Sequence, residues 1–490
     1  MAELSTKGGR VDQILLSRPV SMCASVFSPN LLRPDLLLEA VRCVARSNQN
    51  LDGAALATFP AMRKSLAHSL WTHGTLLFAS LIISCGNPEN SDGQTKDDEK
   101  EPSICGAHAK AAGWVPGEAP PPQAESSAER IASLGRETWD LSLELLRAVP
   151  DLEAENIAHS AVSFYVSLGM TYSRFEDHPC GESIAQVMNF PELGRDLHET
   201  IGATVRLLEE KSLPEEIHQA AVDVSLEQTR WFFSPAVAPE STDIEKLYGA
   251  AIHTVKERGD AARNLINCVV EEQSKGLISN FLPQGAINAD AEQLDLNVTY
   301  LSAPWDIMMA PRVVEFTPEG GTASEVAGFG SEPAYLQYHA GSTFDAISLP
   351  LRGMLKVLIL LPHREATGSL SELTSEIESE SLFEATSSLE SRFVHFRMPK
   401  INIPSQSIDY YERLGLECGP YTVQTAVQAA AIQIDEFGVK AAAATDGGDG
   451  DGDGDEPDEF YVDRPFLFFI YDPETKVVLF SARVMDVAQN

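Results

Sequence analysis

The stretch from residue 434 to residue 484 decides the fold. It begins with IDEFGVKAAAAT at 434–445, continues with DGGDGDGDGDEPDE at 446–459, and ends with FYVDRPFLFFIYDPETKVVLFSARV at 460–484. The middle part holds eight acids and five glycines, with no base and no apolar side chain, whereas the last part is rich in aromatic and β-branched residues. Because aromatic and β-branched residues favour strands and Gly and Asp do not, we expect strands on both sides of an acidic loop.

The chain around this stretch is predicted to be one mixed domain that starts at about residue 128. An amphipathic helix is expected before Pro150, because apolar side chains share one stripe: Ile131, Leu134, Leu141, Leu145 and Val149. Further helices are expected at 185–210, 244–258 and 260–275, and strands at 222–233, 293–301, 311–316, 346–361, 392–402, 423–435 and 462–484. Neither a repeat nor a second boundary is visible, so the pattern favours a single α+β domain, 128–490.

Several motifs resemble those of the serpin family. Residues 434–445 are similar to the serpin hinge, and residues 460–484 are similar to the serpin C-terminal signature. Four other motifs agree with the family in order: NIAHSAVSF at 156–164, INCVVEEQSKGLI at 266–278, LNVTYLSAPW at 296–305 and MPKINI at 398–403. The resemblance implies a serpin fold of the α+β class. Such a fold has a large, mainly antiparallel sheet A, two further sheets, about eight to nine helices and an exposed reactive-centre loop, here at about 436–460.

The resemblance also assigns residues to the functional regions of a serpin. The hinge would comprise Glu436, Gly438, Val439, Ala441, Ala442, Ala443, Ala444 and Thr445. The shutter and breach, where sheet A opens, would comprise Ser160, Ser163, Asn297, Gln428 and Trp305. The scissile bond would lie at Gly452, Asp453 or Gly454. The chain departs from the family at Gln428, which replaces the shutter histidine and predicts a lost pH response, and at Val269, which replaces a tryptophan.

The function that the resemblance implies is protease inhibition, not catalysis. A serpin-type inhibitor is cleaved in its reactive loop, traps a serine or cysteine protease covalently, and inserts the loop into its central sheet. The alternative is a non-inhibitory serpin-like binding protein, whose acidic loop would serve as a partner surface or a cation-binding surface.

The loop sequence suits insertion in its first half better than in its second. Side chains of an inserted strand alternate between core and solvent, so the core would receive Val439, Ala441, Ala443 and Thr445. The same alternation turns Gly447, Asp449 and Asp451 inward. Because burial of an unpaired carboxylate is costly, we expect insertion to be favoured below about pH 5, where the carboxyls can protonate.

The N-terminal region has the order of a bacterial export signal. Residues 62–85 start with Met-Arg-Lys, contain the apolar run GTLLFASLIIS at 74–84 and end at Cys85. This pattern predicts a lipoprotein-type signal peptide with Cys85 as the lipidated residue, a disordered tether at 86–127, and an upstream extension at 1–61 that is untranslated or disordered. The alternative is a buried helix or strand at 74–84. The expected location is the cell envelope or the extracellular space, with membrane contact only through the lipid.

The composition argues against several other classes of function. The chain has 72 acids against 36 Lys and Arg, and its formal net charge of −36 argues against a nucleic-acid partner. Its seven cysteines show no CxxC pair and no zinc spacing, so neither a metal site nor a disulfide framework is indicated. An EF-hand-like series, Asp449, Asp451, Asp453 and Gly454, meets Phe460 where a glutamate ligand is needed, so selective calcium binding is not expected. No cofactor motif is found, and we expect a monomer without enzymatic activity.

Two polar motifs are expected to serve the core. His159 lies in a strand-like segment beside Ser160, which favours a hydrogen-bonded core residue over a general base. Asn297-Val298-Thr299 is formally a glycosylation sequon, but it lies in a predicted central strand and is therefore expected to be buried.

Overall fold

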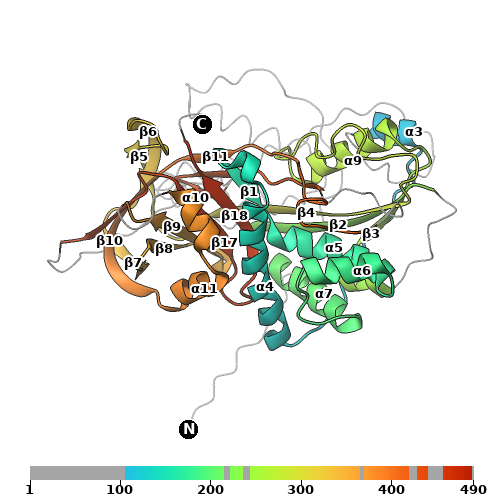
Figure 1. The fold of residues 1–490 in the computed structure, drawn as a ribbon, viewed down its shortest axis with the longest axis horizontal. Helices are drawn as coiled ribbons and strands as arrows, with labels where there is room; N and C mark the ends of the chain where they lie inside the picture. The colour runs from blue at the N-terminus through green and yellow to red at the C-terminus, as the bar shows by residue number, and fades with distance from the viewer. Residues whose placement is uncertain are drawn as a thin grey trace, which may run out of the picture. The chain divides into compact units, whose positions relative to one another are not determined.

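The computed structural model describes residues 105–214, 221–234, 243–364, 369–418, 427–439 and 456–487. In these ranges the chain forms two large β-sheets with helices on their faces (Figure 1). The described part contains nine α-helices: α3 Gly106–Ala112, α4 Ala128–Arg147, α5 Ala161–Phe175, α6 Pro179–Val187, α7 Arg195–Glu209, α8 Asp243–Tyr248, α9 Asp260–Gln273, α10 Leu370–Glu376 and α11 Ser379–Ser387. The predicted α+β class is confirmed.

The sheet that matters for function, called sheet A below, has six strands. Their order is β11 Ile401–Ile403, β14 Ile432–Asp435, β15 Gly438–Val439, β4 Gln293–Pro304, β2 Asp223–Phe232 and β3 Ala251–Thr254. All neighbours are antiparallel except β2 and β3. Sheet A is therefore mainly antiparallel, as predicted.

The second large sheet supplies the core of the other half. Its path is β1 Ile157–His159, β18 Val478–Val484, β17 Phe466–Tyr471, β9 Lys356–Pro362, β8 Phe344–Pro350, β7 Ala334–Ala340, β10 Glu390–Pro399, β6 Ser324–Gly330 and β5 Ala310–Phe316, with β16 Asp458–Tyr461 paired to β10. Every residue of β17 is buried, which explains why this strand is an uninterrupted apolar run. A third sheet pairs β12 Ile408–Asp409 with β13 Val427–Gln428.

Helices cover both faces of strand β4. On one face, Leu265 and Ile266 of α9 belong to the same apolar cluster as Leu294 and Leu296 of β4. Helix α5 packs against the opposite face through the polar contacts described below. Since side chains alternate along a strand, the even-numbered positions of β4 face α9 and the odd-numbered positions face α5.

The folded domain starts earlier than the sequence predicted. Cys105 is fully buried, α3 follows it, and Trp114 stacks on Trp231 of β2 with ring centroids 6.1 Å apart. Val115 then forms a backbone bridge with Thr254 of β3. The prediction that 86–127 is a disordered tether is therefore wrong for residues 105–127. The predicted extension 1–61, the signal peptide 62–85 and the rest of the tether, 86–104, lie outside the described residues.

Two disulfides correct the prediction from cysteine spacing. Cys105 is bonded to Cys268 of α9, and Cys180 of α6 is bonded to Cys418. The paired residues are 163 and 238 positions apart in the chain, so no short spacing pattern could reveal them.

The remaining differences from the predicted elements are local. The helix expected at 244–258 is the short α8 followed by strand β3. The strand expected at 346–361 is the hairpin β8–β9, which turns through Arg352–Met354, where Gly353 has a φ of 75°. Strands β6 and β7 were not predicted, and their sequences, SEVAGFG and AYLQYHA, carry few β-branched residues.

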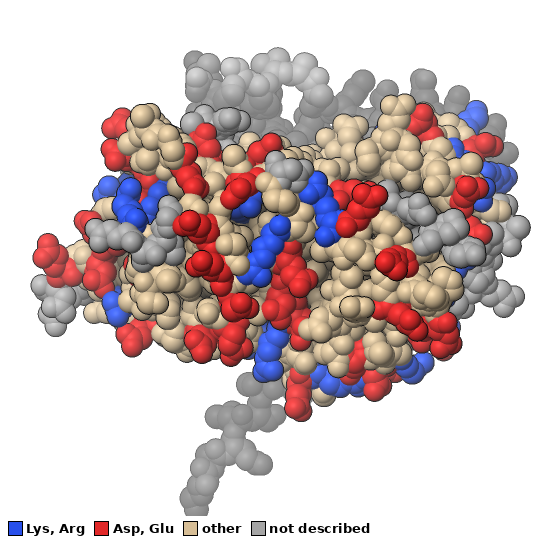
Figure 2. All heavy atoms as spheres, viewed as in Figure 1, with Lys and Arg blue, Asp and Glu red and all other residues tan. Residues whose placement is uncertain are grey.

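The surface reflects the acidic composition. Figure 2 shows Asp and Glu spread over most of the visible face, with Lys and Arg in small groups between them. None of the described helices has the length and apolar character that a bilayer crossing needs.

Candidate functional site, the gap beside strand β4

The hinge has already begun to form a strand inside sheet A. Gly438 and Val439, which constitute β15, pair with β14 on one side and with β4 on the other. Val439 lies opposite Ala303 of β4 and is only 4% exposed. Two predicted hinge residues therefore occupy the first positions of a strand between β14 and β4.

Gly438 is required where the chain turns into this strand. Its φ is 137°, a conformation that disfavours residues with a Cβ atom. A Cβ on Gly438 would also lie 2.3 Å from the carbonyl oxygen of Ala303. Only glycine can thus connect β14 to β15 with this close approach to β4.

Trp305 and Glu436 hold the top of the gap, the region assigned to the breach. The Trp305 indole donates to the carbonyl of Asp435 at 2.8 Å, and its amide donates to the carbonyl of Phe437 at 3.3 Å. Glu436 forms an ion pair with Lys400 at 2.5 Å. Burial alone would raise the pKa of Glu436, but the hydrogen bond from Lys400, a backbone hydrogen bond and the charge of Lys400 together lower the pKa below its usual value. The carboxylate is therefore ionised and paired at neutral pH.

Below Val439, the edge of β4 that faces β14 has no strand partner among the described residues. Two cavities follow this edge. The upper one is lined by Thr299, Leu301, Ile432 and Val439. The lower one is lined by residues of β4, α5 and β13, among them Ser163, Thr171, Gln293, Asp295, Asn297 and Gln428. Together the cavities extend along β4 from Gln293 to Leu301.

The residues assigned to the shutter meet at the lower cavity. Ser160 caps helix α5 by accepting a hydrogen bond from the amide of Ser163 at 3.4 Å. The Ser163 hydroxyl then donates to the carbonyl of Asn297 at 2.9 Å. Asn297 accepts from Thr299 at 2.7 Å through its side-chain oxygen, while its buried Nδ2 has no hydrogen-bond partner in the described part of the chain. The sequon at Asn297 is buried, as predicted.

His159, which the sequence analysis did not assign to the shutter, lies beside the shutter residue Gln428. His159 of β1 is fully buried, is hydrogen-bonded to the Gln428 side chain, and lies 3.1 Å from the Tyr410 hydroxyl. Burial lowers the pKa of His159 to about 3, although the hydrogen bond that the imidazole donates to Gln428 opposes this shift. His159 is thus a hydrogen-bonded core residue, as predicted. The loss of a pH response at Gln428 stays a prediction, since the His159 imidazole beside Gln428 is held neutral by its lowered pKa.

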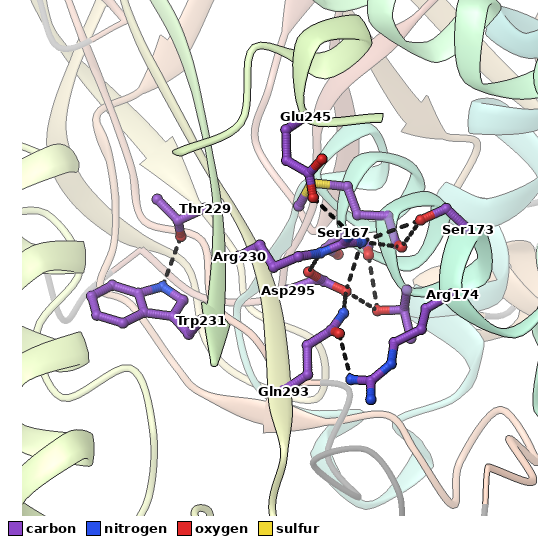
Figure 3. A network of polar contacts seen from close by, with 11 residues as sticks. Ser167, Ser173, Arg174, Thr229, Arg230, Trp231, Glu245, Gln293 and Asp295 are labelled. Atoms are coloured by element: carbon purple, nitrogen blue, oxygen red, sulfur yellow. Dashed lines mark hydrogen bonds and ion pairs between the residues drawn. The ribbon is translucent and has the colours of Figure 1, made fainter. Parts of the chain in front are cut away.

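A buried network of charges borders the lower end of the gap (Figure 3). Arg230 of β2 pairs with Asp295 of β4 at 2.7 Å and with Glu245 of α8 at 3.1 Å. All three side chains are at most 5% exposed. Burial would lower the pKa of Arg230, but the two carboxylates outweigh it and raise the pKa. The cation is therefore held in its charged state.

Gln293 extends this network to the end of α5. Its amide nitrogen donates to Asp295 at 2.6 Å, and its oxygen accepts from Arg174 at 2.7 Å. Sequence reasoning missed this cluster, although one signal was present. Alternate polar residues at 293, 295, 297 and 299 in a predicted central strand indicate a polar face where an apolar one is expected.

Several predicted site residues lie outside the described part of the chain. They are the hinge residues Ala441, Ala442, Ala443, Ala444 and Thr445, the scissile-bond candidates Gly452, Asp453 and Gly454, and the lipidation candidate Cys85.

Within the described ranges, β15 pairs with only the last two residues of β4, and the rest of that edge of β4 has no neighbouring strand. Such an edge offers a row of backbone donors and acceptors to an extended segment. The chain belongs to the serpin family: the family model for serpins, serine protease inhibitors, matches residues 136–416 and 412–487.

Several known proteins are similar to this chain in sequence or in structure. Ovalbumin of Dromaius novaehollandiae is 27% identical over 367 residues, which cover 67% of this chain and 92% of the relative. Leukocyte elastase inhibitor A of Rattus norvegicus is 27% identical over 272 residues, which cover 50% of this chain and 72% of the relative. The native-state structure of tengpin, a thermophilic serpin, superposes with a TM-score of 0.62 and 19% identity, covering 76% of this chain and 97% of that one.

Proposed function

We propose that this protein is a serpin-type protease inhibitor that inserts its cleaved reactive loop between β14 and β4. The observation that carries the proposal is the position of β15. Its two residues pair with both neighbouring strands, and the edge of β4 below them has no strand partner among the described residues. The hinge is thus in register for the rest of the loop to follow.

The energetics favour insertion once the loop is cut. About ten loop residues would gain ladder hydrogen bonds on both sides, and at about 1 kcal/mol net for each bond the gain is on the order of 10–20 kcal/mol. Lys440, the first residue after β15, would face water, and the side chains that follow it are four alanines and a threonine, which can enter a packed interior without a large volume change. The target is a serine or cysteine protease that cleaves near Gly452, Asp453 or Gly454, and the inhibitor acts as a monomer.

Two measurements test this proposal. Cleavage of the loop should raise the thermal midpoint strongly, because the loop becomes a strand of sheet A. Incubation with a target protease should yield a covalent complex that survives denaturing electrophoresis. A cleaved protein with an unchanged midpoint, together with clean release of every protease tried, would refute the inhibitor mechanism.

One observation favours a second candidate, a non-inhibitory binding protein. Residues 446–459 hold eight acids and five glycines, which are poor strand formers. Some serpins do not inhibit proteases, and ovalbumin is one of them. For this candidate the midpoint would not change on cleavage, and the acidic loop would bind a basic partner or cations.

We place the protein outside the cytoplasm, in the cell envelope or the extracellular space, with Cys85 as the lipid anchor. Two disulfides support an oxidising compartment, because thiols stay reduced in most cytosols. Mass spectrometry of the N-terminus of the purified protein tests this assignment. A chain that starts at Cys85 and carries a lipid agrees with it, whereas an unmodified start at Met1 or Met62 contradicts it.

A further inference from the structure

The segment that follows α9 crosses the gap on the α9 face of sheet A. We propose that this crossing segment, residues 277–282, keeps the gap closed before the loop is cut, and that Asn267 is the residue that holds it in place. The proposal rests on the loop insertion proposed above and concerns the rate of insertion, not its extent. The crossing segment and all its contacts named below lie within the described ranges.

The crossing segment lines both cavities of the gap. Leu277 and Ile278 line the upper cavity, between β4 and β14. Phe281 and Leu282 line the lower cavity, between β4 and β13. The same two side chains belong to the apolar cluster of α9, which includes residues of β4 and also Ala429, on the other side of the gap. The crossing segment therefore contacts both sides.

The gap must widen before a strand can enter it. The upper and lower cavities have volumes of about 20 and 70 Å³, which is room for a few water molecules only. A further strand needs about 4.8 Å between its neighbours in the hydrogen-bonding direction. The crossing segment cannot keep its contacts on both sides during this movement, so one set of contacts has to break.

The polar contacts on the β4 side are the stronger set. Asn267 of α9 is only 7% exposed, and it bonds the backbone of Leu282 twice. Its Nδ2 donates to the Leu282 carbonyl at 3.1 Å, and its Oδ1 accepts from the Leu282 amide at 2.7 Å. Lys275, just before the crossing segment, forms an ion pair with Asp223 of β2 and lies 4.4 Å from the ring centroid of Tyr300 of β4.

The polar contact on the β14 side is weaker. Ser407, which precedes β12, donates to the carbonyl of Asn280 at 3.4 Å, and this hydrogen bond is exposed to solvent. Apolar packing at Val427 and Ala429 adds to it. Opening of the gap therefore separates the crossing segment from the β14 side and leaves it attached to α9. Asn267 fixes the end of the segment that reaches this side, so loss of its two hydrogen bonds weakens the closed arrangement.

The backbone of this region is held by its contacts. Lys275 and Asn280 have φ values of 52° and 53°, in the left-handed region that residues with a Cβ atom rarely adopt. Such conformations cost free energy and persist only where surrounding contacts enforce them. The crossing segment can thus relax once its contacts on the β14 side break.

Hydrogen exchange of the intact protein tests the proposal without cutting the loop. Mass spectrometry follows peptides that cover the crossing segment, 277–282, the β4 edge, 293–301, and β17, 466–471. Asn267→Ala should speed exchange of the first two by roughly 10–30-fold, the effect of two buried hydrogen bonds, and leave β17 unchanged. Faster exchange at 277–282 with unchanged exchange at 293–301 would overturn the proposal. Equal acceleration of β17 would also overturn it, because it would indicate general destabilisation.

Two further variants complete this experiment. Ser407→Ala removes only the exposed hydrogen bond on the β14 side and should speed exchange of the crossing segment and the β4 edge by roughly 2–3-fold. Asn264→Ala is the matched control, an asparagine on the same helix whose side chain accepts from Arg263. It should leave both peptides unchanged, and an effect as large as that of Asn267→Ala would contradict the assignment of Asn267.

The rate of loop insertion gives a second measurement. An excess of an acid-directed endoprotease cuts the loop, and samples taken at intervals are heated to a temperature between the midpoints of the intact and the cleaved protein. The fraction that stays folded measures insertion. Asn267→Ala should insert roughly 10–30-fold faster than the wild type and reach the same final midpoint. Equal rates would overturn the role of Asn267 and leave loop insertion intact. If cleavage of the wild type raises no midpoint, the inhibitor mechanism fails, and the control of insertion by the crossing segment fails with it.

Discussion

Replacing His159 by glutamine should flatten the acid side of the stability profile. Burial holds the pKa of His159 near 3 in the native protein, whereas an unfolded chain has a value of about 6.5. Between these two values the unfolded state binds one more proton than the native state, so stability falls as the pH is lowered through this window. The slope is about 1.4 kcal/mol per pH unit, which amounts to about 3 kcal/mol between pH 7 and pH 4.

Urea unfolding of the wild type and of His159→Gln at several pH values between 4 and 7 measures how much His159 contributes to the pH dependence of the free energy of unfolding. Glutamine can keep the hydrogen bonds to Gln428 and Tyr410 but does not titrate. Two other buried histidines with lowered pKa values, His198 and His253, are present in both proteins and cancel in the comparison. The wild type should lose about 3 kcal/mol more than the variant by pH 4. Parallel profiles would show that His159 is not held neutral by the shutter.

Three other changes test separate parts of the structure. Arg230→Met should lower the free energy of unfolding in urea by about 3–5 kcal/mol, because it leaves two buried carboxylates unpaired. A decrease below about 1 kcal/mol would contradict the charge network. Gly438→Ala should displace the hinge from sheet A, because the added Cβ would meet the carbonyl oxygen of Ala303. Amide hydrogen exchange at the hinge should then become faster. Unchanged protection of these amides would contradict the pairing of β15. Replacing Cys105 and Cys268 by alanine should lower the free energy of unfolding in urea by about 3–5 kcal/mol, because the disulfide closes a long loop. Free thiols at both positions in the unreduced wild type would contradict the disulfide.

The motifs that the sequence carries in continuous runs predicted the fold well. The expected strands at 423–435 and 462–484 match β14, β17 and β18, because strand pairing and burial act on neighbouring residues there. The loop expected to be exposed from about residue 436 is buried at Gly438 and Val439, where it forms β15. The start of the domain could not be predicted in the same way. Residues 105–127 look polar and rich in proline, and they are ordered by contacts with α9, β2 and β3, which are distant in the sequence.

In the candidate site, too, the contacts that could not be predicted join residues far apart in the sequence. Gln428 was visible as a departure from the family, but its hydrogen bond with His159 depends on a contact between segments 269 positions apart. Asp295 was visible as an acid in an apolar strand, but its partner Arg230 lies 65 positions away. Long-range pairing of this kind leaves no periodic signal in the chain.

The early start of the domain affects how a large partner can approach. Figure 1 shows α3 at one end of the long axis and β10 at the other. Strand β16, which begins at Asp458 just after the acidic loop, pairs with β10. A protease that docks where the loop rejoins the body would thus occupy the pole opposite Cys105. The disulfide between Cys105 and Cys268 therefore fastens the start of the described domain at the end remote from that docking side.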